Sequence, residues 1–435
     1  VSASASGGGN ASAGGLVGYN DGSIGDSYAT GSPSDATGPV SASASGGGNA
    51  SAGGLVGGNN GSIGASYATG SVNASASGGG FASAGGLVGE NHSGGSIAAS
   101  YATGPVSASA SGGGYASAGG LVGYNAGSIG ASYATGPVSA STSDGDASAG
   151  GLVGENVGSI SASYATGSVS ASPSGFCFAY AGGLVGYNGG SIGDSYATGS
   201  VSASGDRNAY AGGLVGENVG SISASYATGS AIASGGSLNR AGGLVGVGDN
   251  GGTITGAFYA TTDVNGNVIN HGGVADGDWS GNALGTGKSL ADLKKAGTFA
   301  AWGAKVDDRG GSGAVWRIYE GNTTPLLRSF LTALTVDAGT LADRVYDGSA
   351  ASGTVGSYTP SVSGAQPAGS LSYTAVSKNA GTYRTSDGSL RLGGLYSDQR
   401  GYDISYAGSS LTVTPAALTV TTGAVTKTYD GTTAA

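Results

Sequence analysis

The stretch GGLVGYNDGSIGDSYATG, from Gly14 to Gly31, returns seven more times in this chain, with the last copy degraded. The pentad GGLVG begins at residues 14, 53, 85, 119, 150, 182, 212 and 242, so successive copies are 39, 32, 34, 31, 32, 30 and 30 residues apart. Self-similarity at a period of about 30 residues is typical of a solenoid, in which each copy is one coil. The array covers Val1 to about Thr262.

Each copy contains three short alternating segments, VSASA, AGGLVGYN and GSIGDSYATG, and each segment predicts a β-strand. In the third segment Ile24 and Tyr28 are four residues apart, so we expect them on one face of a strand. Gly and Asn bound the segments and favour turns. The sequence therefore predicts an all-β fold, a β-solenoid of about eight coils with roughly 30 residues each.

Residues that recur at one phase of the repeat predict columns of identical side chains along the solenoid. Two interior columns are expected from Leu16, Leu55, Leu87, Leu121, Leu152, Leu184, Leu214 and Leu244, and from Ile24, Ile63, Ile97, Ile129, Ile160, Ile192, Ile222 and Ile254. A stack of rings is expected from Tyr28, Tyr67, Tyr101, Tyr133, Tyr164, Tyr196 and Tyr226, closed by Phe258. An amide ladder between coils is expected from Asn20, Asn59, Asn91, Asn125, Asn156, Asn188 and Asn218. Asp26 and Asp194 lie two residues from both the Ile and the Tyr, so a regular strand would place all three on one face. The strand therefore either bulges or has another orientation, and the sequence does not decide which face is buried.

Variation between the copies is confined to a few positions. The residue before the ladder Asn alternates between Tyr and Glu, at Tyr19, Tyr124, Tyr187, Glu90, Glu155 and Glu217, which indicates an exposed edge. Insertions fall in turns, between Tyr28 and Val40 and at residues 92–94. The segment GGGNAS becomes GGGFAS, GGGYAS, SDGDAS and SGFCFAY in other copies. Loops on one rim of a solenoid can carry its binding specificity, and drift without function is the competing interpretation.

Composition and charge narrow the classes of function. The chain has 435 residues with 94 Gly, 9% charged residues, one Cys, no Met and a net charge of −10. Up to residue 262 the only basic residues are Arg207 and Arg240, so nothing could neutralise a nucleic-acid backbone and no nucleic-acid partner is expected. No run approaches the ~20 apolar residues of a membrane span. The missing Met and the repeat phase at Val1 lead us to expect a piece of a longer protein.

The consensus GGLVGxNxGSIxxSYATGxV resembles the GLUG-motif repeat, over about Val1 to Thr262. That repeat occurs in large bacterial surface and secreted proteins, especially adhesins related to filamentous haemagglutinin. The resemblance implies a secreted or cell-surface exoprotein, exported by an outer-membrane partner in two-partner secretion.

Residues 263–331 are expected to form a cap, because an open solenoid end exposes unpaired strands. Ser289 and the following LADLKK predict a capped short turn of helix. The series Trp…WxIxEG…PxLR resembles the segment that ends GLUG arrays. We expect Trp302, Trp316 and Leu326 to cover the last coil.

The tail repeats itself with a longer period. Ala333-Leu-Thr-Val returns at Ala417, and Tyr346-Asp-Gly returns at Tyr429, 83 residues on. These segments resemble the YDG/MBG-type modules of the same exoproteins. We expect one mostly-β module at residues 332–416, a sandwich or β-grasp that serves as a stalk, and the truncated start of a second at residues 417–435.

Two segments weakly resemble ligand sites. Gly285-Thr-Gly-Lys-Ser suggests a phosphate loop, but the motif needs Gly where Asn282 stands. Asp263-Val-Asn-Gly-Asn opens like a calcium loop, but Gly266 is misplaced and position twelve is Val274. We expect no cofactor and no metal at either segment.

The inventory of reactive side chains argues against an enzyme. His92 and His271 do not recur in the repeat, and Cys177 has no predictable His partner. A carbohydrate-active β-helix would need clustered carboxylates or basic residues on one face, and the array has two arginines. No catalytic, cofactor-binding or metal residue is assigned. Sequons at Asn10, Asn49, Asn60, Asn73, Asn91 and Asn322 suggest glycosylation, although chance supplies several in a Ser-rich chain.

The sequence leaves two main hypotheses for function. The first is an adhesive rod that binds host-cell or glycan receptors or neighbouring bacterial cells, and that takes part in biofilm. The second is a passive spacer that presents a distal domain. A carbohydrate-active enzyme is the weakest alternative.

Overall fold

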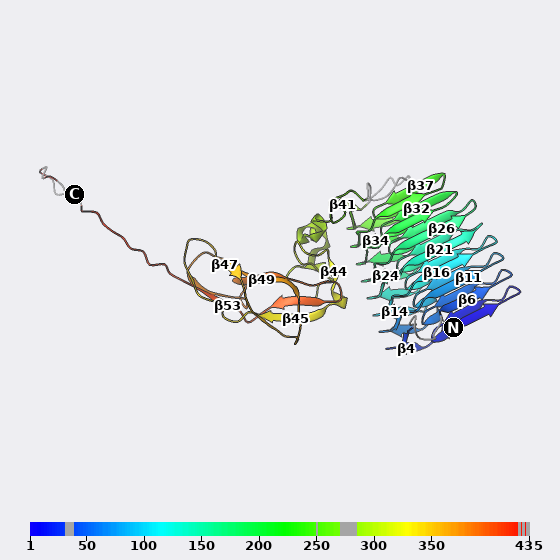
Figure 1. Cartoon of the computed structure of the whole chain (residues 1–435), viewed down its shortest axis with the longest axis horizontal. Coiled ribbons are helices and arrows are strands. Elements are labelled where there is room, and N and C mark those ends of the chain that lie inside the picture. The colour runs from blue at the N-terminus through cyan, green and yellow to red at the C-terminus, as the bar shows by residue number, and fades with distance from the viewer. Residues whose placement is uncertain (31–38, 249–250, 270–284, 425–427, 429–430, 432–435) are drawn as a thin grey trace. The chain divides into compact units, whose positions relative to one another are not determined.

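The computed structural model describes residues 1–30, 39–248, 251–269, 285–424, 428 and 431. The chain divides into two compact units, one of residues 1–308 and 312–331 and one of residues 309–311 and 332–435 (Figure 1). The first unit contains a β-solenoid, and the second is mostly β. The predicted all-β solenoid and the mostly-β C-terminal module are therefore confirmed. Among the described residues, no helix has the length and apolar character needed to cross a membrane.

Each coil of the solenoid has five short strands, so the expectation of three is wrong. The second coil consists of β6 (Val40–Ala44), β7 (Ala50–Gly53), β8 (Val56–Asn59), β9 (Ser62–Gly64) and β10 (Tyr67–Ala68). The segment AGGLVGYN breaks at its paired glycines, because the chain turns sharply there. A Cβ on Gly53 would lie 1.8 Å from the carbonyl oxygen of Val56, which only glycine avoids.

The segment GSIGDSYATG also breaks, at a residue in the left-handed conformation. Asp26, Ala65, Ala99, Ala131, Ala162, Asp194 and Ala224 have φ between 44° and 50°, and Gly256 has φ 57°. The corner separates the Ile strand from the Tyr strand, so Ile63 lies in the core while Tyr67 points outward and Ala68 points inward. The expectation that Ile and Tyr share one strand face is wrong for this reason, and the open question of Asp26 and Asp194 is resolved.

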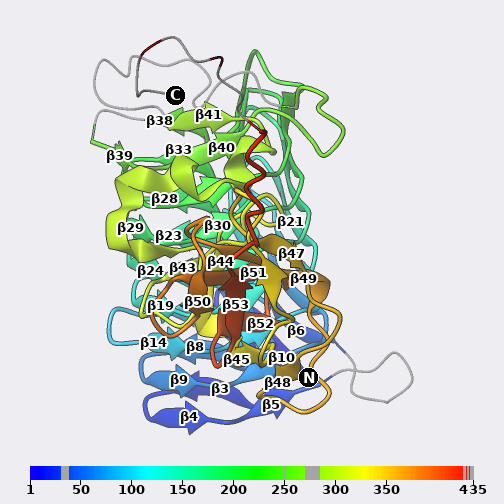
Figure 2. The ribbon, with the colours of Figure 1, turned by 90° about the vertical axis from the view of Figure 1, so that its left-hand side faces the viewer.

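Equivalent strands of successive coils pair in parallel and in register, and they build five sheets that we name A to E (Figure 2). Sheet A contains β1 (Ser2–Ala5), β6, β11 (Val72–Ala76), β16 (Val106–Ala110), β21 (Val138–Ser143), β26 (Val169–Ser174), β31 (Val201–Ser204) and β36 (Ala231–Ser234). Sheet B contains β2 (Ala11–Gly14), β7, β12 (Ala82–Gly85), β17 (Ala116–Gly119), β22 (Ala147–Gly150), β27 (Phe178–Gly182), β32 (Asn208–Gly212) and β37 (Leu238–Gly242). Sheet C contains β3 (Val17–Asn20), β8, β13 (Val88–Asn91), β18 (Val122–Asn125), β23 (Val153–Asn156), β28 (Val185–Asn188), β33 (Val215–Asn218) and β38 (Val245–Gly248).

The remaining two sheets are narrower. Sheet D contains β4 (Ser23–Gly25), β9, β14 (Ser96–Ala98), β19 (Ser128–Gly130), β24 (Ser159–Ser161), β29 (Ser191–Gly193), β34 (Ser221–Ser223) and β39 (Thr253–Thr255). Sheet E contains β5 (Tyr28–Ala29), β10, β15 (Tyr101–Ala102), β20 (Tyr133–Ala134), β25 (Tyr164–Ala165), β30 (Tyr196–Ala197), β35 (Tyr226–Ala227), β40 (Phe258–Ala260) and β41 (Thr286–Lys288).

The solenoid has two hydrophobic cores. Sheets A and B enclose one made of Ala and Val side chains, which are small and allow close packing. Sheets C, D and E enclose the other, which holds the predicted Leu and Ile columns. These columns are buried from the second coil on, with Leu55 at 0% and Ile63 at 1% exposed, whereas Leu16 of the first coil is 53% exposed. The two interior columns are confirmed.

The amide ladder of the Asn column is also confirmed. Each Nδ2 donates to the Oδ1 of the Asn in the next coil, at 2.7–2.8 Å, in an unbroken series from Asn20 to Asn218. The same amide donates to a backbone carbonyl in its own turn, as Asn125 does to Gly127. The insertion at residues 92–94 lengthens that turn, and Asn91 then reaches Gly95 instead. Buried amides therefore keep their partners through the array.

A second ladder, which the sequence did not reveal, lies before the Tyr column. The Oγ of each buried Ser accepts the N–H of the equivalent Ser in the preceding coil, as Ser132 does from Ser100. The Oγ also donates to the carbonyl two residues back, which is Gly130 for Ser132. This serine fixes the left-handed corner from within its own coil and from the next one.

The Tyr rings stack as predicted, with centroids 4.8–5.2 Å apart, and Phe258 pairs with Tyr226 at the end of the column. The column lies on the outside of the solenoid. Its burial changes along the array, from 62% exposed at Tyr28 to 6% at Tyr133 and 0% at Tyr226. A segment after the array therefore covers its C-terminal part.

The covering segment consists of η1 (Asp292–Lys294), η2 (Ala296–Lys305), β42 (Val306–Asp307), β43 (Trp316–Arg317), β44 (Leu326–Leu327) and η3 (Arg328–Phe330). The predicted turn of helix is the 3₁₀ turn η1, where Ser289 Oγ accepts the N–H of Asp292. The array end itself receives one strand, because β41 pairs with β40.

The segment packs along the Tyr column, which corrects the expectation that its large side chains cover the last coil. Phe330 meets Tyr133 and Tyr164 edge-on, at 5.6 and 5.0 Å between centroids. Trp316 lies 5.7 Å from Tyr226, whose hydroxyl donates to the Pro325 carbonyl at 2.6 Å. Trp302 does reach the last coil, where it contacts Phe258 at 5.7 Å. The segment thus buries the outward rings of the C-terminal coils against its own aromatic side chains.

The second unit has three three-stranded sheets. Its strands are β45 (Thr332–Asp337), β46 (Arg344–Val345), β47 (Ser352–Thr354), β48 (Thr359–Pro360), β49 (Ala368–Ala375), β50 (Gly381–Arg384), β51 (Leu390–Tyr396), β52 (Tyr402–Tyr406) and β53 (Ser410–Thr414). Tyr383, Leu390 and Leu411 belong to its core. Residues 417–424 form no strand, and most of the expected second module lies outside the described residues.

The Asn ladder makes a prediction about stability. Asn125→Ala removes the acceptor of Asn91 and the donor to Asn156, so each of these buried amides loses one hydrogen bond between coils. We expect a loss of about 2–3 kcal/mol of unfolding free energy, measured by urea denaturation followed by circular dichroism. Asn20→Ala is the control, because it breaks one bond between coils at the array end, and its loss should be smaller. Equal losses would contradict the ladder as a continuous support.

The left-handed corner makes a second prediction. Ala131 has φ 45°, a conformation that strains any residue with a Cβ, so Ala131→Gly should stabilise the chain by about 0.5–1 kcal/mol. Ala134→Gly is the matched control in the same coil, since Ala134 is fully buried in a strand and should lose about 1 kcal/mol or more. Thermal unfolding of both variants measures the difference, and a loss for Ala131→Gly would refute the strain.

Candidate binding face

Three columns on sheets B and C carry side chains of different size and charge in different coils, while the buried Leu and Val columns beside them repeat in every coil. The first column is Asn10, Asn49, Phe81, Tyr115, Asp146, Phe178, Asn208 and Leu238. The second is Ser12, Ser51, Ser83, Ser117, Ser148, Tyr180, Tyr210 and Arg240. The third is Tyr19, Gly58, Glu90, Tyr124, Glu155, Tyr187, Glu217 and Val247. We call these three columns the variable face.

The backbone fixes where these side chains point. Successive residues of a strand alternate between its two faces, so Ala179 and Ala181 enter the core while Phe178 and Tyr180 point away from it. In the first five coils the second column is Ser, whose Oγ donates to a carbonyl six residues on, as Ser51 does to Gly57 at 2.8 Å. In the last three coils Tyr or Arg replaces this Ser, and the short Ser hydroxyl that donates to the carbonyl six residues on is absent.

The replacements produce an aromatic patch, which we define as Phe176, Phe178, Tyr180, Arg207 and Tyr210. Phe178 and Tyr180 are parallel within 6° at 5.9 Å between centroids, and Tyr180 lies 5.7 Å from Tyr210. Phe176 is 74% exposed. Large exposed apolar groups gathered in one place commonly mark an interaction site.

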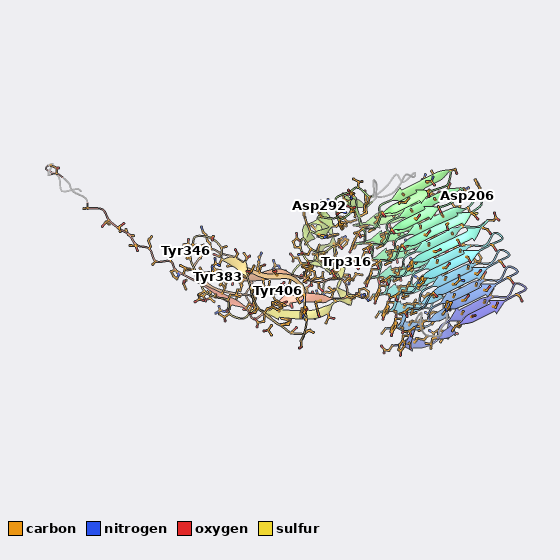
Figure 3. The ribbon with its side chains drawn as sticks, in the orientation of Figure 1. Asp206, Asp292, Trp316, Tyr346, Tyr383 and Tyr406 are labelled. Atoms are coloured by element: carbon orange, nitrogen blue, oxygen red, sulfur yellow. The ribbon has the colours of Figure 1, made fainter. Side chains whose placement is uncertain are left out.

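The guanidinium of Arg207 lies over two of these rings. Its Cζ is 4.9 Å from the centroid of Phe176 and 4.4 Å from that of Phe178. Such cation–π contacts orient a guanidinium while its N–H groups stay available to a ligand. The neighbouring Asp206, labelled in Figure 3, lies in the turn between β31 and β32 and accepts the N–H of Gly175 at 2.9 Å.

Carboxylates and phenols of the variable face are partly removed from water. Burial raises the pKa of Glu155, and it raises the pKa of Glu90 against the opposing effect of His92. Burial is also the main cause that raises the pKa of Tyr180, with Glu217 adding to it. These polar groups are partly buried and lie beside aromatic rings. Such a combination is typical of a binding surface.

Sequence reasoning identified part of this face. The Tyr/Glu alternation and the variable GGGNAS segment were both recognised, but the sequence did not show that they adjoin. Arg207 was counted only as a charge. The replacement of Ser by Tyr180, Tyr210 and Arg240 was missed, although an alignment of the eight copies contains that signal.

The weaker sequence candidates have structural roles. Thr286–Lys288 of the phosphate-loop look-alike is strand β41. Asp263 accepts the N–H groups of Asn265 and Asn267 and the Asn267 amide, and these bonds lower the pKa of its carboxyl group. Asp194 forms an ion pair with Lys305 at 2.7 Å. Across the part of the chain that the structure describes, no group of three potential metal ligands occurs.

Of the reactive side chains that the structure describes, His92 lies in the third coil and Cys177 in the sixth. Cys177 is buried beneath the aromatic patch, with 8% of its surface exposed, and burial raises the pKa of its thiol. His92 lies beside Tyr19, with 5.8 Å between ring centroids. His271 lies outside the described residues. Among the sequons, Asn91 is buried in the amide ladder and cannot accept a glycan in the folded chain, whereas glycosylation at the others stays a prediction.

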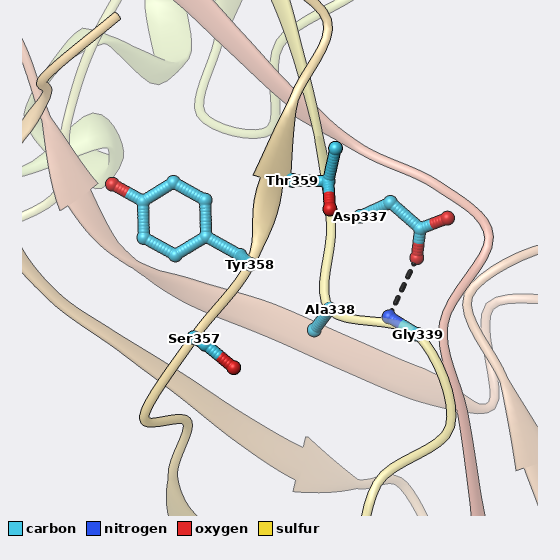
Figure 4. A pocket seen from close by; sticks show the side chains of 6 residues that line it. All are labelled: Asp337, Ala338, Gly339, Ser357, Tyr358 and Thr359. Carbon is cyan, nitrogen blue, oxygen red and sulfur yellow. Dashed lines mark hydrogen bonds between the residues drawn. The ribbon is translucent and has the colours of Figure 1, made fainter. Parts of the chain in front are cut away.

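The second unit contains a shallow pocket of about 230 Å³ (Figure 4). It is lined by Asp337, Ala338, Gly339, Ser357, Tyr358 and Thr359. The Asp337 carboxylate accepts the N–H of Gly339 at 2.7 Å and the hydroxyl of Ser409 at 3.2 Å. Its charge thus serves the local turn, and the variable face remains the stronger candidate.

Fold and face together define a repetitive parallel β-solenoid with a side-covering segment. The family model described as the GLUG motif matches residues 179–202, within the sixth repeat, which supports a GLUG-repeat protein. Among solved structures the chain is similar to a putative immunoglobulin A1 protease from Bacteroides ovatus. The similarity covers 66% of this chain and 74% of that chain, with 21% identity and a TM-score of 0.34. No curated protein matches the chain.

The part-buried carboxylates predict a pH dependence. The folded chain holds the proton of Glu155 more tightly than the unfolded chain does, so stability falls as the pH rises above the ordinary Glu value of 4.5. Glu155→Gln should therefore raise the thermal midpoint at pH 7 and change it little at pH 4, as measured by circular dichroism. Ser128→Ala, at an exposed and non-titrating position, is the control and should show no such pH dependence. A lower midpoint for Glu155→Gln at pH 7 would contradict the prediction.

Proposed function

We propose that this chain is the adhesive segment of a bacterial exoprotein that is secreted or held at the cell surface. In this proposal the variable face binds host-cell or glycan receptors or neighbouring bacterial cells, and the chain acts by binding rather than by catalysis. Export by an outer-membrane partner and a role in biofilm belong to the same proposal. The GLUG repeat and the β-solenoid support a repetitive extracellular rod.

One observation carries the proposal: large aromatic and charged side chains that change from coil to coil gather on one outward face. Buried columns of the array repeat nearly the same residue in every coil, and the segment after the array covers the C-terminal part of the Tyr column. The variable face instead changes from Asn, Ser and Gly in the second coil to Phe, Tyr and Tyr in the sixth. A surface that only spaced two domains would not need large exposed rings, which expose apolar area to water.

The register defines a test with a matched variant. The sixth-coil loop Ser174–Tyr180 aligns with the plain loop Ser6–Ser12, so Phe176→Gly, Cys177→Gly, Phe178→Asn and Tyr180→Ser together restore the chain's own plain version. We expect saturable binding of the full chain to a panel of host cells, bacterial cells and immobilised glycans, and a loss of binding for this variant.

The variant and the parent chain must show the same β-rich circular dichroism spectrum and thermal midpoint within a few degrees. Absence of binding by the folded parent chain would refute adhesion and would favour the passive spacer. Equal binding by the plain variant would refute the role of the sixth coil in adhesion.

A further inference from the structure

We propose that the aromatic patch binds an uncharged saccharide. The proposal rests on the proposed function, because it names the ligand class for one part of the variable face. It is argued from the rings, from Arg207 and from the charges around them.

The patch offers both surfaces that a saccharide needs. Phe176 is 74% exposed and provides an apolar ring on which the C–H face of a pyranose can pack, and Phe178 extends this apolar surface. Arg207 stacks on both rings, so its planar guanidinium is held in place with donors directed along its edge. Apolar rings with a few fixed polar groups are the usual construction of small-molecule sites.

Further hydrogen-bonding groups surround the rings. Asp206 Oδ2 accepts the N–H of Gly175, which fixes the carboxylate in the turn beside Arg207. The amide of Asn208 donates to the hydroxyl of Tyr210 at 2.7 Å, so the buried phenol, 7% exposed, fixes the half-buried Asn208 amide beside the rings. A carboxylate acceptor, a guanidinium donor and a side-chain amide together match the mixed donor and acceptor character of sugar hydroxyls.

Charge favours an uncharged ligand over a charged one. Asp146 and Asp206 accept the N–H groups of Phe178 and Gly175, at 2.8 and 2.9 Å, and Glu217 adds its charge beside Tyr180. Among the described residues, the cations that face the patch are Arg207 and Arg240, whose Cζ lies 6.0 Å from the centroid of Tyr210. The carboxylates outnumber the guanidinium groups, which disfavours an anionic ligand. A cationic ligand would be repelled by the guanidinium of Arg207, which already lies over Phe176 and Phe178.

The experiment uses the full chain and defined probes. Isothermal titration and saturation-transfer NMR are run with uncharged oligosaccharides of glucose, galactose, mannose and N-acetylhexosamines. Sialyllactose and an oligo-arginine peptide are the charged comparators. We expect saturable binding of at least one uncharged oligosaccharide, with weaker or no binding of the two charged probes.

Variants place the site. Phe176→Ala with Phe178→Ala should weaken binding about ten-fold or more. Arg207→Lys should also weaken it, because Lys keeps the charge but loses the planar stack. Tyr28→Ala is the control, since Tyr28 is an exposed aromatic residue, at 62%, and lies on the Tyr column, outside the variable face. Phe176→Ala alone, at an exposed position, serves if the double variant does not fold.

The outcomes separate the two proposals. No saturable binding of any uncharged probe, preferential binding of a charged probe, or an equal loss with Tyr28→Ala would overturn the saccharide site. Cell adhesion that survives those results would leave the proposed function standing. Saccharide binding at the patch without adhesion to any cell would leave this inference standing and refute cell adhesion, the part of the proposed function that goes beyond glycan binding.

Discussion

The structure depends on one constraint, which is the in-register pairing of each strand with its own copy in the next coil. Backbone hydrogen bonds set the distance between coils, so each side chain lies next to the equivalent side chain about 4.8 Å away. A buried column can therefore hold only a residue type whose side chains pack or hydrogen-bond favourably against identical side chains. Asn pairs with Asn through its amide, Tyr stacks on Tyr, and Leu and Ala fill the cores. Buried columns therefore converge on one residue type.

The same constraint explains the shortage of charge. Two carboxylates at this spacing repel each other, and a column of them would be costly. The third column of the variable face avoids this, because it alternates Glu90, Tyr124, Glu155, Tyr187 and Glu217, and no Glu is next to another. Desolvation beside the rings still raises the pKa of Glu90 and Glu155. In this column, aromatic residues separate the acidic groups in the third to seventh coils.

How much the sequence predicts follows from this constraint. The Leu, Ile, Tyr and Asn columns were predictable, because identical residues at one phase must stack. The five-strand coil was not, because Ala65 and Ala131 do not reveal a left-handed corner. Of the corner residues, Gly256 favours this conformation, and Asp26 and Asp194 tolerate it better than Ala does. The sequence also did not predict that the covering segment lies beside the array. This position depends on the outward direction of the Tyr side chains, which the left-handed corner determines. The aromatic patch was predictable in part. The sequence shows which positions vary between copies, but it does not show which of these positions are neighbours in the fold.

A solenoid of this kind can diversify only where side chains leave the stack. A new residue in a buried column loses its partners on both sides, as it would at the Asn ladder between Asn91 and Asn156. A new residue on an outward column breaks few contacts, and it can contact the substituted residues of neighbouring coils. The replacement of Ser by Tyr180 and Tyr210 in adjacent coils gathers rings from both, and Arg207 then stacks on rings of the coil before it. Recognition chemistry therefore accumulates on one face while the ladders beneath it keep the fold constant.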